Sequence, residues 1–115
     1  MENITAAKLL RIFIGESDKI NGEPLFEAIV YAAKKQGLAG ATVTRGMMGF
    51  GANSRVHTAK LLDLSSDLPL IVEILDTEDK IRDFTLHVER MFEDSKSGGL
   101  ITLEKAEVIR YKAGK

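Results

Sequence analysis

The stretch that divides this chain into two halves runs Thr44-Arg45-Gly46-Met47-Met48-Gly49-Phe50-Gly51-Ala52-Asn53-Ser54-Arg55-Val56-His57-Thr58. The sequence before it reads as strand, helix, strand, and the sequence after it repeats this order. Its three glycines permit backbone angles and close approaches that larger residues forbid. A loop with open backbone N–H groups between Arg45 and Arg55 suits an anionic ligand. The competing interpretation is a purely structural hairpin connection.

The first half predicts a strand, a helix and a second strand. The first strand is expected over Lys8–Ile14, where both faces are largely apolar. Pro24 suits the first turn of a helix. The apolar stripe that follows predicts a helix ending near Lys35, with Gly37 as its left-handed cap. A β-branched strand then begins near Ala41 and leads into the glycine-rich stretch.

The second half repeats the pattern. Leu70–Leu75 is apolar at five of six positions, which is typical of a central strand. Asp76 or Thr77 is expected to cap a second helix, which ends near Asp94. A last strand is expected over 100–111. The order β-α-β-β-α-β predicts an α+β, ferredoxin-like sandwich, with two helices on one face of a four-stranded antiparallel sheet.

Length and composition limit the function classes. A chain of 115 residues predicts one domain over 1–115. The net charge of −1 argues against a nucleic-acid coat or an anionic membrane surface. The lack of cysteine excludes disulfides, thiolate metal sites and a cysteine nucleophile, and fits a reducing cytoplasm. No signal peptide or membrane-spanning run is visible. Abundant charge without cysteine is typical of a thermophilic source.

The sheet face that two helices leave open is predicted to be apolar as well. Its apolar residues on the two central strands are Leu9, Phe13, Ile71 and Leu75. Exposed together, they would form a large apolar patch, which predicts that a second copy of the chain covers it. Arg11 shares this face and needs an anionic partner there, for which Glu73 on the neighbouring central strand is expected.

No catalytic or metal-binding residues are assigned from the sequence. It shows neither a nucleophile–base pair nor a metal-ligand cluster. His57 lacks a partner at metal-ligand spacing and is interpreted as structural, and turn chemistry accounts for Glu16 and Asp18. RNA-recognition domains of this topology carry stacking aromatics on their central strands. The third strand here has none, so nucleic-acid binding is not expected.

Short motifs spread over nearly the whole chain point to a known family. They are Arg11-Ile12-Phe13-Ile14-Gly15-Glu16-Ser17-Asp18, Pro24-Leu25-Phe26-Glu27-Ala28-Ile29, Gly40-Ala41-Thr42-Val43, Gly49-Phe50-Gly51-Ala52, His57-Thr58, Asp67-Leu68-Pro69-Leu70 and Val108-Ile109-Arg110-Tyr111. In this order they resemble the small bacterial and archaeal PII-like family catalogued as domain of unknown function 190. More distantly, the chain resembles the PII signalling proteins, which are ferredoxin-like trimers that bind adenine nucleotides between subunits.

The resemblance to PII proteins implies a ligand site. With Arg55 from the charge argument above, the residues expected to bind ligand are Gly49, Phe50, Gly51, Ala52, Asn53, Arg55, Gly98, Gly99, Leu100 and Arg110. Residues 50–66 would form the mobile loop that reports binding to a protein partner. Phe50 either covers an adenine ring or folds into a subunit interface. PII proteins carry a lysine where this chain has Leu100, so ADP, AMP, a cyclic nucleotide or another small anion fits as well as ATP.

The expected function is therefore a cytoplasmic PII-like small-molecule sensor. It would be a homo-oligomer, with a trimer favoured by the resemblance, and it would require no metal or other cofactor. Its expected ligand is an adenine nucleotide or a similar anion in the clefts between subunits. The alternative is a small phosphoester- or acyl-phosphate-processing enzyme, because acylphosphatases share this fold.

Overall fold

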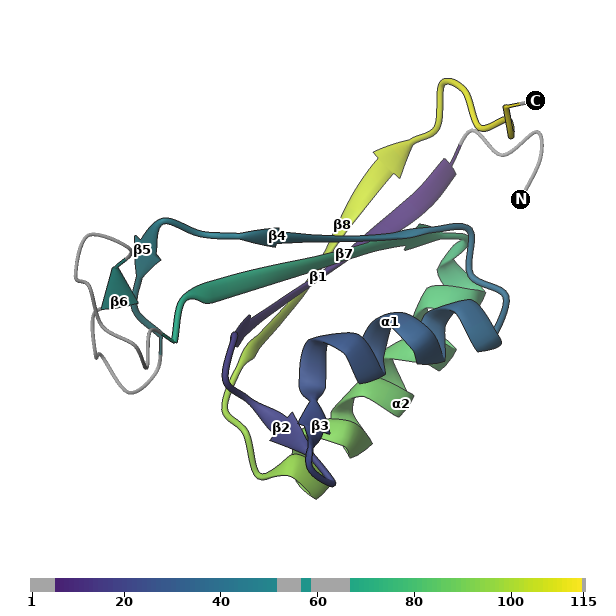
Figure 1. Cartoon of the computed structure of the whole chain (residues 1–115). Helices are drawn as coiled ribbons and strands as arrows, with labels where there is room; N and C mark the ends of the chain where they lie inside the picture. Colours follow the sequence, from purple (N-terminus) through teal and green to yellow (C-terminus); the bar gives the residue numbers. More distant parts are fainter. Residues whose placement is uncertain (1–5, 52–56, 59–66, 115) are drawn as a thin grey trace.

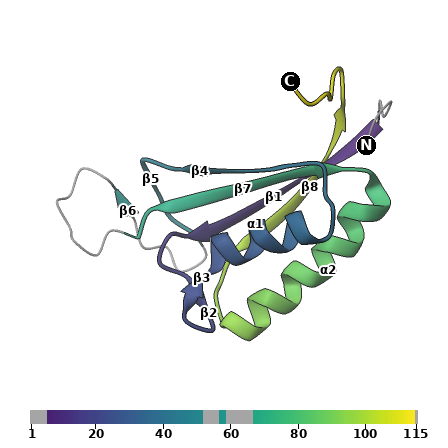
Figure 2. The same ribbon diagram turned by 45° about the vertical axis from the view of Figure 1, so that its right-hand side comes forward.

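A computed structural model describes residues 6–51, 57–58 and 67–114, the pair 57–58 by its backbone. Four antiparallel strands form one sheet in the order β4-β7-β1-β8. The sheet strands and the two helices that pack on the sheet are, in chain order, β1 (Ala6–Gly15), α1 (Leu25–Lys35), β4 (Ala41–Arg45), β7 (Pro69–Asp76), α2 (Glu78–Ser95) and β8 (Leu100–Glu107). Figure 1 shows both helices on one side of the sheet, and Figure 2 confirms this arrangement after a 45° turn. The expected ferredoxin-like α+β fold is confirmed.

The core lies between the helices and the sheet face that they cover. Alternate residues of β1 and β7 point into it, because strand side chains have a period of two. The fully buried members include Leu10, Ile12, Val72 and Ile74 on the strands, and Ile29, Ile81, Phe84 and Val88 on the helices. Each large side chain removed from water in this way contributes about 1.5–3 kcal/mol. In the described part of the chain, neither helix is long and apolar enough to span a bilayer.

Two short hairpins add to the predicted elements. β2 (Lys19–Ile20) pairs with β3 (Glu23–Pro24) directly before α1. Asn21 and Gly22, at its tip, have φ values of 50° and 82°. An Asn-Gly pair with positive φ is the preferred tight hairpin turn. The second hairpin joins β5 (Met48–Gly49) to β6 (His57–Thr58) inside the glycine-rich stretch.

The last strand ends earlier than predicted. β8 stops at Glu107 rather than continuing to Tyr111. Beyond it, the Tyr111 hydroxyl donates a hydrogen bond to the Ala39 carbonyl oxygen at 2.6 Å. The chain therefore leaves the sheet edge, which places Arg110 three residues beyond the strand.

The end of β7 is joined to the start of α2 and to the segment before β4 by Asp76. Its carboxylate is buried, with 1% of the residue exposed. One oxygen accepts a bond from the Ala39 amide at 2.9 Å, and the other accepts one from the Thr77 amide at 2.6 Å. A buried carboxylate without such partners would be costly. Thr77 takes the N-cap position of α2, as one of the two predicted alternatives.

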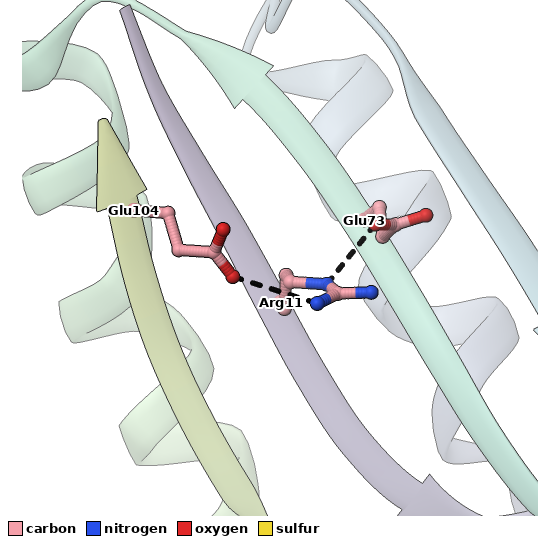
Figure 3. A network of polar contacts seen from close by, with 3 residues as sticks. All are labelled: Arg11, Glu73 and Glu104. Carbon is pink, nitrogen blue, oxygen red and sulfur yellow. Dashed lines mark hydrogen bonds and ion pairs between the residues drawn. The ribbon is translucent and has the colours of Figure 1, made fainter. Parts of the chain in front are cut away.

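The open face of the sheet carries a charged cluster at its centre (Figure 3). Arg11 Nε donates to Glu73 Oε2 at 3.1 Å, and Arg11 Nη1 donates to Glu104 Oε1 at 3.4 Å. The guanidinium carbon also lies 5.7 Å from the centre of the Phe13 ring. The predicted pair of Arg11 with Glu73 is confirmed, whereas Glu104 comes from the edge strand β8. The four apolar side chains predicted for this face are half-buried in the single chain.

Candidate functional site

The glycine-rich stretch starts by folding back over Pro69. The Gly46 amide donates to the Pro69 carbonyl oxygen at 2.7 Å. A Cβ atom at Gly46 would lie 2.9 Å from Pro69 Cγ, and one at Gly49 would lie 3.3 Å from the same atom. Ordinary contacts between carbon atoms are about 3.5–4.0 Å. Close approach to Pro69 therefore explains these two glycines, whereas a Cβ at Gly51 would meet no atom of the described residues within 4 Å.

The return stem of the same stretch is held by the turn that follows β1. The Ser17 amide donates to Asp67 Oδ1 at 2.8 Å. The Glu16 amide donates to the Leu68 carbonyl oxygen at 2.8 Å. The turn closes on itself, because Asp18 Oδ2 accepts a bond from the Gly15 amide at 2.9 Å. The interpretation of Glu16 and Asp18 as turn residues agrees with these contacts.

The outgoing stem is held by the same turn through an ion pair. Arg45, the last residue of β4, places its guanidinium Nη2 against Glu16 Oε2. The Arg45 side chain is 61% exposed and that of Glu16 is 25% exposed. The sequence reasoning placed Arg45 beside the anion site but did not foresee this partner. A signal was available, since Arg45 ends β4 and Glu16 directly follows β1, and both strands point to the same end of the sheet.

Electrostatics at the turn act on Asp18. Burial raises the pKa of its carboxyl above the ordinary value of 3.8. The bond from the Gly15 amide lowers the pKa, and the nearby charge of Asp67 raises it. The net direction is upward, so folding favours the protonated form of Asp18.

The first half of the glycine-rich stretch carries three large, exposed apolar side chains. Met47, Met48 and Phe50 are 78%, 60% and 70% exposed. An exposed aromatic ring beside a glycine segment is available to a ligand or to a second copy of the chain. Of the predicted site residues, Ala52, Asn53 and Arg55 lie outside the described part of the chain.

The second predicted segment begins β8. A Cβ atom at Gly99 would lie 2.9 Å from the Phe13 carbonyl oxygen and 2.9 Å from the Phe92 ring. Gly99 is therefore needed for the passage of the backbone between β1 and α2, whatever else it does. At Gly98 a Cβ would meet no atom within 4 Å among the residues that the structure describes, and Leu100 is 56% exposed. All three residues of the segment are exposed.

Strand register shows how the two segments lie relative to each other. Thr44, Ile71, Phe13 and Leu100 follow one another across the sheet in a single row. Both segments thus lie at the same end of the sheet, but at opposite edges. Three strand spacings separate the edges, which is about 14 Å. The single chain therefore does not bring its two glycine segments together.

Arg110 lies away from both segments. β8 runs eight residues from Leu100 to Glu107, which spans about 23 Å. Figure 1 shows the chain after β8 at the end of the sheet opposite β5. Within one chain, Arg110 is therefore remote from Gly49 and from Gly98.

Other features of the described part do not coincide with the predicted site. A cavity of about 520 Å³ is lined by Ala6, Ala7, Lys8, Glu78, Lys105, Ala106 and Glu107. None of the predicted site residues lines it, and it lies at the other end of β1 and β8. Among the described residues, no group of three His, Cys, Asp or Glu side chains is arranged to hold a metal ion.

Comparison with known proteins identifies the family. The model of the DUF190 family, described as "Uncharacterized ACR", matches residues 7–108. A UPF0166 protein of Aquifex aeolicus (strain VF5) is 42% identical over 106 residues, covering 92% of this chain and 96% of that protein. A UPF0166 protein of Methanocaldococcus jannaschii is 34% identical over 104 residues, covering 90% and 93%.

A solved structure shares the fold. It is CPII from Thiomonas intermedia K12, a nitrogen regulatory PII-like protein bound to ADP, AMP and bicarbonate. The TM-score is 0.70 at 16% identity, over 96% of this chain and 94% of that one. At this identity the likeness concerns the fold. The match of the family model to residues 7–108, together with the two UPF0166 relatives, shows that the chain belongs to the DUF190 family.

Proposed function

We propose that this protein is a PII-like small-molecule sensor that binds an adenine nucleotide or a similar anion in clefts between subunits and signals through residues 50–66. The observation that carries the proposal is the separation of the two glycine segments. They lie at the same end of the sheet but beside opposite edges, which are separated by three strand spacings, or about 14 Å. A ligand that contacts both segments at close range therefore needs the second segment from a neighbouring copy.

The open face of the sheet supplies a surface for that neighbour. Its central strands present half-buried apolar side chains around the charged cluster of Arg11, Glu73 and Glu104. A second copy would remove this apolar surface from water, which is the main driving force for association. We favour a homotrimer, as in the PII proteins that the chain resembles.

The chemistry around the first segment suits a nucleotide. Phe50 offers an exposed ring on which a base can stack, and Arg45 and Arg55 supply guanidinium groups for phosphate. Gly98 and Leu100 would close the site from the neighbouring copy, and Arg110 would add a cation. The ADP and AMP bound to CPII, which shares this fold, support an adenine nucleotide as the first ligand to test.

We further propose that residues 1–115 act as one domain in the cytoplasm, and that binding rather than turnover is the activity. Residues 50 and 51 begin the reporting segment, most of which lies outside the described residues. In this proposal, ligand binding at its base changes the contact of the segment with a protein partner.

Calorimetry with ADP, AMP and ATP tests the proposal, with light scattering to measure the oligomer. We expect a trimer that binds at least one of the three nucleotides. Phe50→Ala is expected to weaken that binding about fivefold or more, since stacking of a base on an aromatic ring contributes about 1–3 kcal/mol. The matched control is Tyr31→Ala, which removes a similarly exposed ring from α1 and should leave binding unchanged.

Two results would contradict the proposal. A well-folded monomer that binds none of the nucleotides would leave no basis for an inter-subunit site. Hydrolysis of an acyl phosphate or phosphoester that is lost in Arg45→Ala would favour the enzyme alternative instead.

A further inference from the structure

The turn at residues 15–18 holds both stems of the glycine-rich stretch, but by different kinds of contact. The return stem is tied through main-chain groups and Asp67, by bonds of 2.8 Å from the amides of Ser17 and Glu16. The outgoing stem is tied through the ion pair of Arg45 with Glu16. An ion pair between side chains can be exchanged for another ion pair without breaking the backbone contacts of the turn.

The guanidinium of Arg45 is the group for which an anionic ligand would compete. Its N–H fork binds carboxylates and phosphates with the same geometry. Through Nη2, Glu16 therefore occupies one of the guanidinium donors that a phosphate group would use. The Arg45 side chain is 61% exposed, so a ligand reaches it from solvent. The Glu16 side chain is 25% exposed, and the Glu16 backbone is held by the hydrogen bond from its amide to the Leu68 carbonyl oxygen.

We propose that Glu16 is a built-in competitor for the anion at Arg45, which holds the guanidinium in the free protein and is displaced when a phosphate group binds. The inference rests on the proposed function, because it assigns a regulator to the same anion site. Glu16 raises the ligand concentration needed for binding. Its displacement removes the ion pair between the outgoing stem and the turn, while the hydrogen bond from the Gly46 amide to the Pro69 carbonyl oxygen still joins the outgoing stem to the return stem. Binding of an anion at Arg45 is thereby coupled to the contact between the turn and the stem that leads into residues 50–66.

The expected size of the effect follows from the exposure of the pair. Ion pairs that are largely open to solvent are weak, so removing Glu16 as a competitor should tighten anion binding about twofold to fivefold. Glu16→Asp is the sharper variant. It keeps the negative charge near Arg45 but shortens the side chain by one methylene, which withdraws the carboxylate from Nη2.

Calorimetry with ADP, and separately with pyrophosphate, tests this on the wild type, Glu16→Gln, Glu16→Asp, Arg45→Gln and the double variant Glu16→Gln/Arg45→Gln. Both Glu16 variants should bind about twofold to fivefold more tightly. In the Arg45→Gln background, Glu16→Gln should change nothing, because coupling between two residues vanishes when one partner is removed. Glu89→Gln, on the exposed side of α2, is the control for loss of one negative charge.

The outcomes separate this inference from the proposed function. Wild-type affinity in Glu16→Gln, or an equal gain with and without Arg45, overturns the competitor while a nucleotide sensor stands. If Glu16→Gln binds the anion more tightly but Glu16→Asp binds it as the wild type does, the effect comes from the negative charge in general and not from the contact with Nη2, which also overturns the competitor. Pyrophosphate binding that follows the expected cycle, without any ADP binding, supports the competitor and removes the nucleotide sensor. Failure of both ligands to bind every variant overturns both proposals.

Discussion

The two adjacent glycines of the second segment are expected to respond to alanine in opposite ways. Gly99→Ala places a methyl group 2.9 Å from the Phe13 carbonyl oxygen and from the Phe92 ring. The ring can shift, but the carbonyl belongs to a central strand that is paired on both sides. Gly98→Ala places the same methyl group where no atom of the described part of the chain lies within 4 Å. The pair therefore isolates the effect of steric overlap, with the same chemical change at neighbouring positions.

The overlap sets the magnitude. The added methyl group would lie about 0.6 Å inside the usual minimum contact of 3.5 Å. Overpacking of this kind costs about 1–3 kcal/mol of stability. Gly98→Ala is expected to gain up to about 1 kcal/mol, because alanine restricts the unfolded chain. For a domain of this size, about 4 °C of Tm corresponds to 1 kcal/mol, so Gly99→Ala should lower Tm by about 4–12 °C.

The assay is thermal and urea unfolding followed by circular dichroism. All variants are compared at one protein concentration, because the Tm of an oligomer depends on concentration. Equal stability of Gly99→Ala and Gly98→Ala would refute the steric reasoning. Calorimetry with ADP on the same two proteins adds a second result: Gly98→Ala should weaken binding without loss of stability, if Gly98 faces the ligand.

Three further perturbations follow from the structure. Arg11→Ala leaves Glu73 and Glu104 without their cation on the face that a second copy would cover. Light scattering should show dissociation to monomers, and replacing both glutamates by glutamine should partly restore the oligomer. An intact Arg11→Ala oligomer would contradict this. The pKa of Asp18 is raised in the folded state above its ordinary value of 3.8, so protonation of Asp18 stabilises the fold. This contribution to stability is present below pH 3.8 and is lost as the pH rises through the folded-state pKa. In a plot of the urea unfolding midpoint against pH, Asp18→Asn should therefore remove the fall over this pH range. A profile equal to that of the wild type would contradict the assignment. Gly22→Ala, at a φ of +82°, should cost about 1 kcal/mol in urea unfolding, whereas unchanged stability would show that the hairpin turn tolerates a side chain.

Much of the fold could be predicted from local patterns. Continuous apolar runs located β1 and β7, whose side chains alternate between the two faces of the sheet, and the helical stripe of α2 placed Ile81 and Phe84 in the core. The same alternation put Arg11 and Glu73 on one face of neighbouring strands. Asn21-Gly22 was a local signal as well, but no hairpin was predicted at this position.

The candidate site depended more on the tertiary structure. The sequence by itself determined the order of the elements, the apolar open face and the two glycine segments as candidates for ligand binding. Only the three-dimensional arrangement decided that these segments lie at opposite edges of the sheet, that Gly99 is required beside Phe13, and that Arg45 meets Glu16. These facts depend on strand order and register, which bring together residues far apart in the chain. Local periodicity reports the face on which a side chain lies, but it does not report which distant side chain it meets there.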